Sequence, residues 1–148
     1  DDIVLMAAWF NIWDNKDYYK EARRDIPRMV GLTPCDQASL AMCMNQSDVG
    51  LFPNRCEGGT NLVMMEYLAC GKPVIANSST GQRDVLKTAY SISIEGDDEK
   101  LVEQMVEYVE FLYSRREVLS LMGSVAGKVM NYWSWGKTAD GITRAMNT

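Results

Sequence analysis

The sequence predicts an α/β fold in which a parallel sheet carries helices on both faces and is followed by a C-terminal helical segment. Short apolar runs alternate with longer amphipathic ones, which is the pattern of successive strand–helix–strand units. The apolar content of 47% and the charged content of 24% are close to those of average globular proteins. The 148 residues suffice for one hydrophobic core, so residues 1–148 are expected to form a single domain.

Five apolar runs are expected to be strands, because each is short and bounded by polar or turn residues. The first is continuously apolar, as buried strands of parallel sheets are, and the last alternates strictly. The five runs cover residues 4–10, 30–33, 48–52, 73–76 and 90–94. A ligand of such a sheet binds beyond the carboxyl ends of the strands, which directs attention to the segment after the third run.

Helices are expected at residues 14–29, with the end near Pro27, and at 35–46, 62–70 and 81–86, and the chain is expected to be wholly helical from residue 98 onward. Asn61 is a good N-cap for the third of these helices, and Gly71 with Pro73 forms its C-terminal stop. In the final segment Ser134 is expected to cap a last helix that Trp133 and Trp135 pack. One apolar stripe is expected along Leu101, Val102, Met105, Val106, Val109 and Leu112.

Composition excludes several classes of function. The formal net charge is −5, which argues against a nucleic-acid partner held by phosphate contacts. No apolar run approaches the roughly 18 residues that span a bilayer, and the first residues lack the features of a signal peptide. The sequence contains no histidine, so His-based triads and His metal sites are excluded within this chain.

The four cysteines are interpreted as reduced, buried thiols of a cytoplasmic protein. They form no C-x-x-C pair that would suggest a zinc or redox site, and lie at Cys35, Cys43, Cys56 and Cys70. No D-x-D arrangement is present, and Asp97-Asp98 reads as a solvated helix start. We therefore expect neither a metal ion nor a cofactor.

The segment from Asn54 to Glu66 is the candidate ligand-binding site. It runs from a strand end through Gly58 and Gly59 into a helix, so backbone amides with a partial positive charge would face a ligand there. This arrangement suits a phosphate group, to which Arg55 would add a full charge. A tight turn before a capped helix explains the pattern of glycines equally well.

Two carboxylates favour the ligand interpretation. An acid beside a phosphate site is electrostatically unfavourable unless it accepts hydrogen bonds from hydroxyl groups. Glu66, one turn inside the helix, would accept them from a ribose diol, and Glu57, at the mouth of the site, from a sugar. Phosphates held by amides and sugars held by carboxylates describe a nucleotide-sugar.

The run CEGGTNLVMMEYLACGKPVIA at residues 56–76 resembles the donor-site signature of family 4 (group 1) retaining glycosyltransferases. The runs SDVGLFP at 47–53 and TGQRDVL at 80–86 are similar to the strand before that signature and the loop after it. The resemblance implies the Rossmann-like C-terminal domain of the two-domain GT-B fold, which binds the donor. It also implies an N-terminal acceptor domain that is absent from this chain.

The resemblance assigns roles to individual positions. Glu57 matches the motif glutamate near the transferred sugar and is the candidate catalytic residue, whereas Glu66 matches the glutamate that holds the ribose hydroxyls. Residues 32–34, Leu-Thr-Pro, are similar in position to the loop that contacts the base. Gly58 belongs to the same loop, and the positions whose amides face the diphosphate and sugar are Gly59, Thr60, Asn61 and Leu62.

The sequence departs from the family pattern in two further places. Glu57 and Glu66 are nine positions apart, one more than in the family. The family's cation after the first strand has only Lys16 as a counterpart, and Trp9 and Trp13 are read either as stacking residues or as core.

The resemblance implies transfer of a hexose from a nucleotide-diphospho-sugar with retention at the anomeric carbon. The isolated chain is then expected to bind the donor without turning it over. Two alternatives remain at this point: a sugar-nucleotide epimerase on the same scaffold, and a non-catalytic interaction domain. An oxidoreductase that binds a dinucleotide is disfavoured, because no G-x-G-x-x-G follows the first strand.

Overall fold

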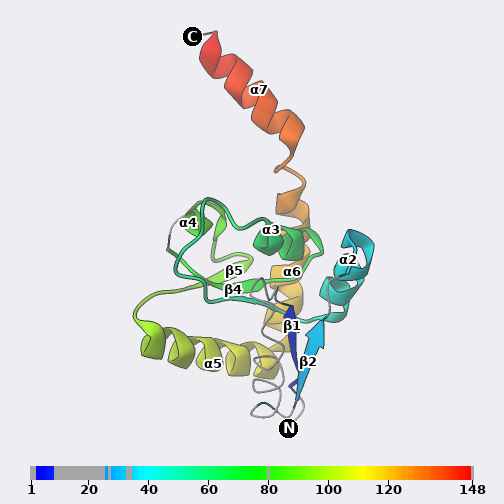
Figure 1. Ribbon diagram of the computed structural model, residues 1–148, viewed down its shortest axis with the longest axis vertical. Coiled ribbons are helices and arrows are strands. Elements are labelled where there is room, and N and C mark those ends of the chain that lie inside the picture. The colour runs from blue at the N-terminus through cyan, green and yellow to red at the C-terminus, as the bar shows by residue number, and fades with distance from the viewer. Residues whose placement is uncertain (1–2, 9–25, 27, 33–34, 80, 148) are drawn as a thin grey trace, which may run out of the picture. The chain divides into compact units, whose positions relative to one another are not determined.

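The computed structural model describes residues 3–8, 26, 28–32, 35–79 and 81–147 (Figure 1). The chain divides into two compact units, Asp1–Met42 and Cys43–Thr148, and each contains a parallel sheet. The expectation of a single domain stays a prediction.

The first unit contains two strands, β1 (Leu5–Ala8) and β2 (Met29–Leu32), which pair in parallel with Leu5 opposite Met29. Both predicted strands are confirmed within the described residues. Met29 already belongs to β2, and the helix expected at 14–29, with its end near Pro27, lies mostly outside the described residues. Also outside them are Trp9, Trp13, Lys16, Thr33 and Pro34.

Helix α2 (Gln37–Gln46) confirms the helix predicted from residue 35. The Asp36 carboxylate accepts a hydrogen bond of 2.7 Å from the Ser39 backbone N–H, as the side chain before a helix commonly does. This contact lowers the pKa of the Asp36 carboxyl below its ordinary value.

The second unit is built on three parallel strands in the order β3-β4-β5. They are β3 (Gly50–Phe52), β4 (Val74–Asn77) and β5 (Ser91–Ile94). In the register, Val74 lies opposite both Gly50 and Ser91, so the three carboxyl ends reach the same edge of the sheet. The predicted edge for a ligand site therefore exists in this unit.

Helices α3 (Leu62–Ala69) and α4 (Gln82–Val85) connect these strands, as predicted. Residues 98–146 are helical as predicted, apart from Arg115 and residues 131–134, and form α5 (Asp98–Ser114), α6 (Arg116–Met130) and α7 (Trp135–Met146). The carboxylate of Asp97 caps α5 by accepting from the Lys100 N–H at 3.1 Å, which confirms that this pair of acids begins a helix.

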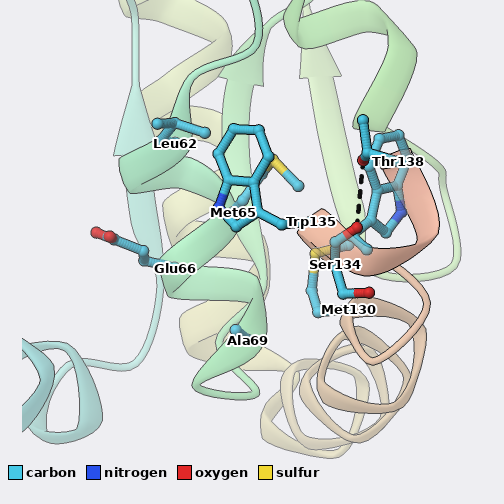
Figure 2. Close-up of a pocket in the computed structure, with 9 residues that line it drawn as sticks. Leu62, Met65, Glu66, Ala69, Met130, Ser134, Trp135 and Thr138 are labelled. Atoms are coloured by element: carbon cyan, nitrogen blue, oxygen red, sulfur yellow. Dashed lines mark hydrogen bonds between the residues drawn. The ribbon is translucent and has the colours of Figure 1, made fainter. Parts of the chain in front are cut away.

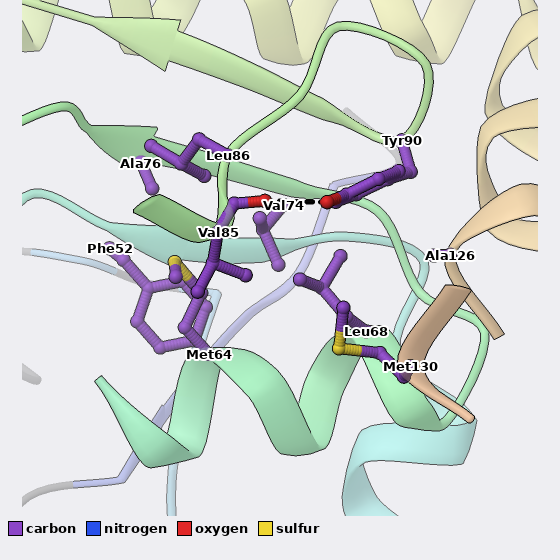
Figure 3. Close-up of a cluster of buried hydrophobic side chains, with 10 residues drawn as sticks. All are labelled: Phe52, Met64, Leu68, Val74, Ala76, Val85, Leu86, Tyr90, Ala126 and Met130. Carbon is purple, nitrogen blue, oxygen red and sulfur yellow. Dashed lines mark hydrogen bonds between the residues drawn. The ribbon is translucent and has the colours of Figure 1, made fainter. Parts of the chain in front are cut away.

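Alternate residues of β4 point to opposite faces of the sheet, and each face has its own core. Val74 and Ala76 belong to a cluster under α3 (Figure 3), which also contains Phe52, Met64, Leu68, Val85, Leu86, Tyr90, Ala126 and Met130. Ile75 belongs to the cluster under α5, with Ile94, Leu101, Leu112 and Met122. Helices thus cover both faces, and the predicted fold class is confirmed.

The apolar surface of the C-terminal helices is less covered than the sequence predicts. Val102 and Val106 of the expected stripe are 64% and 53% exposed, because α5 buries a narrower face. Ser134 is the N-cap of α7, as predicted. The expectation that Trp133 and Trp135 pack is wrong, since they are 47% and 83% exposed and α7 has no buried residue.

The four cysteines are free thiols, but their predicted burial is wrong. Cys35 and Cys56 are exposed, while Cys43 and Cys70 are half-buried. The reason is their position, because Cys35 precedes α2 and Cys56 lies in the loop before α3. Among the described helices, none has the length and apolar character required to cross a membrane.

Candidate functional site

The loop between β3 and α3 leaves the carboxyl edge of the sheet and exposes its backbone. Gly58 and Gly59 are both exposed, and a Cβ added to either would meet no atom within 4 Å. The protein itself therefore does not require glycine at these two positions for space. Open space on that side is what a ligand in contact with the loop backbone needs.

The start of α3 has a partly satisfied set of backbone amides. Asn61 is the N-cap, and its side-chain oxygen accepts from the Met64 N–H at 3.0 Å. Among the described residues, nothing accepts a hydrogen bond from the N–H groups of Leu62 and Val63. The first turn of α3 thus presents two unpaired amides, at the positive end of the helix dipole.

The two predicted acids lie at this same helix start. Glu57 is half-buried, and its Oε1 accepts from Asn61 Nδ2 at 2.9 Å. Glu66 is exposed, four residues after Leu62 and hence about 6 Å farther along the helix axis. Glu57 thus contacts the N-cap of α3, and Glu66 is exposed one turn farther on; their assignment to sugar and ribose hydroxyls stays a prediction.

Glu66 also borders a pocket of about 350 Å³ (Figure 2). One wall is α3, and the other is the junction of α6 and α7, with the lining residues Leu62, Met65, Glu66, Ala69, Met130, Trp133, Ser134, Trp135 and Thr138. Figure 2 shows the Glu66 carboxylate pointing away from the Trp135 indole. The pocket is thus mainly apolar, and no periodic signal in the sequence joins these distant segments.

Arg55 forms an exposed ion pair with the first residue of α5. Its Nε lies 3.2 Å from Oδ1 of Asp98, the first residue of α5. The assignment of Arg55 to a diphosphate stays a prediction, and Asp98 competes for its charge in this conformation.

Two contacts that the sequence did not reveal hold the site loop in place. Ser79 Oγ donates to the carbonyl oxygens of Asn54 and Arg55, at 3.3 Å each. A Cβ on Gly81 would lie 2.5 Å from the carbonyl carbon of Gly59, so the loop after β4 packs directly on the peptide that follows Gly59. The motif at 80–86 placed this loop nearby, but the sequence carries no sign of its close approach.

Together the fold and the site define a parallel α/β domain in which a helix at the carboxyl edge of the sheet begins with unpaired backbone amides. Residues 14–110 match the family described as Glycosyl transferases group 1, and the chain belongs to this family.

A relative in Corynebacterium glutamicum is 31% identical over 111 residues, which are 69% of this chain and 28% of that protein. It is a GDP-mannose-dependent monoacylated alpha-(1-6)-phosphatidylinositol monomannoside mannosyltransferase. The chain thus spans little more than a quarter of this relative.

Two solved structures share the fold at low sequence identity. The structure of Anabaena HepE in complex with UDP superposes with a TM-score of 0.77 and 15% identity, over 98% of this chain and 41% of HepE. Sucrose-phosphate synthase from Thermosynechococcus elongatus superposes with a TM-score of 0.77 and 18% sequence identity, over 97% of this chain and 37% of that chain. The GT-B fold implied by the motif is therefore confirmed.

Proposed function

We propose that this chain binds the nucleotide-diphospho-sugar donor of a retaining glycosyltransferase of the hexosyltransferase type. The observation that carries the proposal is the start of α3, where the unpaired amides of Leu62 and Val63 follow the Asn61 cap that binds Glu57, and where Glu66 stands exposed one turn farther along the helix. Backbone amides suit a diphosphate, and carboxylates suit hydroxyl groups. Family membership supports the reaction class.

In this proposal the amides act mainly when the sugar leaves. When the bond between the anomeric carbon and the diphosphate breaks, negative charge develops on the departing diphosphate. Backbone N–H groups that already point at this charge stabilise the transition state. Glu57 accepts from hydroxyls of the transferred sugar, and Glu66 accepts from the ribose diol. A chain spanning 28% to 41% of its relatives would bind the donor, while turnover would also require the acceptor domain.

Calorimetric titration with UDP, GDP and ADP tests the proposal and identifies the base. The relative is GDP-mannose-dependent and the HepE structure contains UDP, so GDP and UDP are the leading candidate nucleotides. Binding of one nucleoside diphosphate with preference over the other two supports the proposal. Absence of binding of all three would instead favour a non-catalytic interaction domain.

Substitution of the two acids separates their roles. Glu66→Ala is expected to weaken nucleotide binding about 10- to 100-fold, because hydrogen bonds to a charged group are lost. Glu103→Ala is the matched control, since it removes an exposed carboxylate from α5 on the opposite face of the sheet. In the complete enzyme Glu57→Ala is expected to abolish turnover while nucleotide binding survives. Normal kinetics of both the Glu57 and the Glu66 variants would exclude these roles.

A further inference from the structure

Asn61 joins the helix start to Glu57 through both ends of one amide group. Its Oδ1 accepts from the Met64 N–H at 3.0 Å, and its Nδ2 donates to Glu57 Oε1 at 2.9 Å. The residue is 8% exposed, so water does not readily replace either bond. A backbone N–H only donates and a carboxylate only accepts, and this leaves a single consistent orientation of the amide.

Helix capping alone does not explain asparagine at this position. Serine, threonine and aspartate also cap helices, because each offers an oxygen to the first-turn amides. Serine and threonine are too short to span to Glu57 as well, and aspartate would place a second negative charge against it. Among good N-cap residues, asparagine combines the required acceptor with a neutral donor of sufficient reach.

The bond from Asn61 Nδ2 restrains the Glu57 side chain, which is followed by two glycines with open space around them. Glu57 precedes Gly58 and Gly59, neither of which would meet an atom within 4 Å even with a Cβ. Glutamate loses much rotamer freedom when its carboxylate is held, and a bond to a buried partner provides that restraint. No donor to Oε2 of Glu57 is found in the described part of the chain, so this oxygen can accept from a ligand.

We propose that the Asn61 side chain is a positioning residue, which holds the Glu57 carboxylate toward the transferred sugar while it caps α3. This inference rests on the proposed function, in which Glu57 accepts from sugar hydroxyls. It adds that the sugar's contribution to donor affinity depends on the Asn61–Glu57 bond.

The test compares Asn61→Ser with Asn61→Ala in two measurements. The first is the melting temperature, which reports the helix cap. The second is the ratio of the dissociation constant of the nucleoside diphosphate to that of its sugar nucleotide, with the pairs UDP and UDP-glucose, and GDP and GDP-mannose. A residue that only caps the helix changes the melting temperature and has no means to change this ratio selectively.

Asn61→Ser retains a capping oxygen and is expected to melt closer to the wild type than Asn61→Ala. Both variants are expected to lower the ratio about tenfold, because the hydrogen bond between the Glu57 carboxylate and a sugar hydroxyl is lost. Glu57→Ala is expected to lower it to the same extent. In the Glu57→Ala background, Asn61→Ser is expected to cause no further loss of the ratio.

An unchanged ratio in Asn61→Ser, with a melting temperature that follows the strength of the cap, would reduce Asn61 to a helix cap and overturn the inference. A further fall of the ratio in the Glu57→Ala background would overturn it as well. If the wild type binds neither nucleoside diphosphate, the proposed function fails and the inference fails with it. The two failures are thus distinguishable.

Discussion

Replacement of Gly81 by alanine is expected to shift the site loop and weaken nucleotide binding. Gly81 has φ −67° and ψ −10°, which any residue adopts, so the effect comes from space and not from backbone strain. Its added Cβ would lie 2.5 Å and 2.6 Å from the carbonyl carbon and oxygen of Gly59, and 2.7 Å from the nitrogen of Thr60. These are backbone atoms, which no change of rotamer can remove.

The magnitude follows from this geometry. Ordinary van der Waals contact begins at 3.4 Å, so the closest pair at 2.5 Å must separate by about 0.9 Å. Overpacking of this kind costs about 1–3 kcal/mol, and the smaller entropy of the unfolded alanine variant offsets about 0.4–1 kcal/mol. We expect a net loss of about 1–2 kcal/mol in the free energy of unfolding. If the amides of the site loop bind the donor as proposed, a similar displacement exceeds the tolerance of a hydrogen bond, so affinity should fall at least about tenfold.

Urea unfolding and calorimetric titration with UDP and GDP measure the two effects. Gly141→Ala is the matched control, because its Cβ would meet nothing within 4 Å and it lies inside α7. The control should gain up to about 1 kcal/mol from helix propensity and leave nucleotide affinity unchanged. Wild-type stability and affinity of Gly81→Ala would refute the reasoning, since they would mean that the two loops are not in contact.

Asp98→Asn should tighten binding of the nucleoside diphosphate about two- to fivefold, because it releases Arg55 from an exposed ion pair. Isothermal titration at low salt measures this gain. The gain should vanish in an Arg55→Ala background. Met64→Ala should lower the free energy of unfolding by about 2–5 kcal/mol, since Met64 is fully buried under α3. Tyr90→Phe leaves the Val85 carbonyl without its 2.6 Å hydrogen bond and should cost about 1–3 kcal/mol in urea unfolding. Burial raises the pKa of Tyr90 above its ordinary value of 10.0. The stability that the protonated phenol contributes is therefore present below pH 10 and is lost as the pH rises through the folded pKa. A base-unfolding profile that is equally steep in Tyr90→Phe would contradict this.

Local signals were sufficient to locate most elements of the second unit. The strands β3, β4 and β5 and the helix α3 follow from apolar runs and from stop signals such as Gly71 and Pro73. Asn61 was recognisable as an N-cap because capping depends only on neighbouring residues. Failures occurred where distant packing decides. The narrow buried face of α5 and the exposure of Trp135 carry no local signature.

The sequence by itself determined the fold class, the helix start at the carboxyl edge of the sheet and the presence of two acids beside it. These features depend on the order and spacing of residues within about twenty positions, which hydrophobic periodicity and capping record directly. Only the tertiary structure decided that Gly81 packs on the Gly59 peptide, that Asp98 holds Arg55, and that Asn61 binds Glu57. Such contacts depend on which side chains and backbone atoms meet after folding, and distances of a few ångströms are not encoded in any one segment.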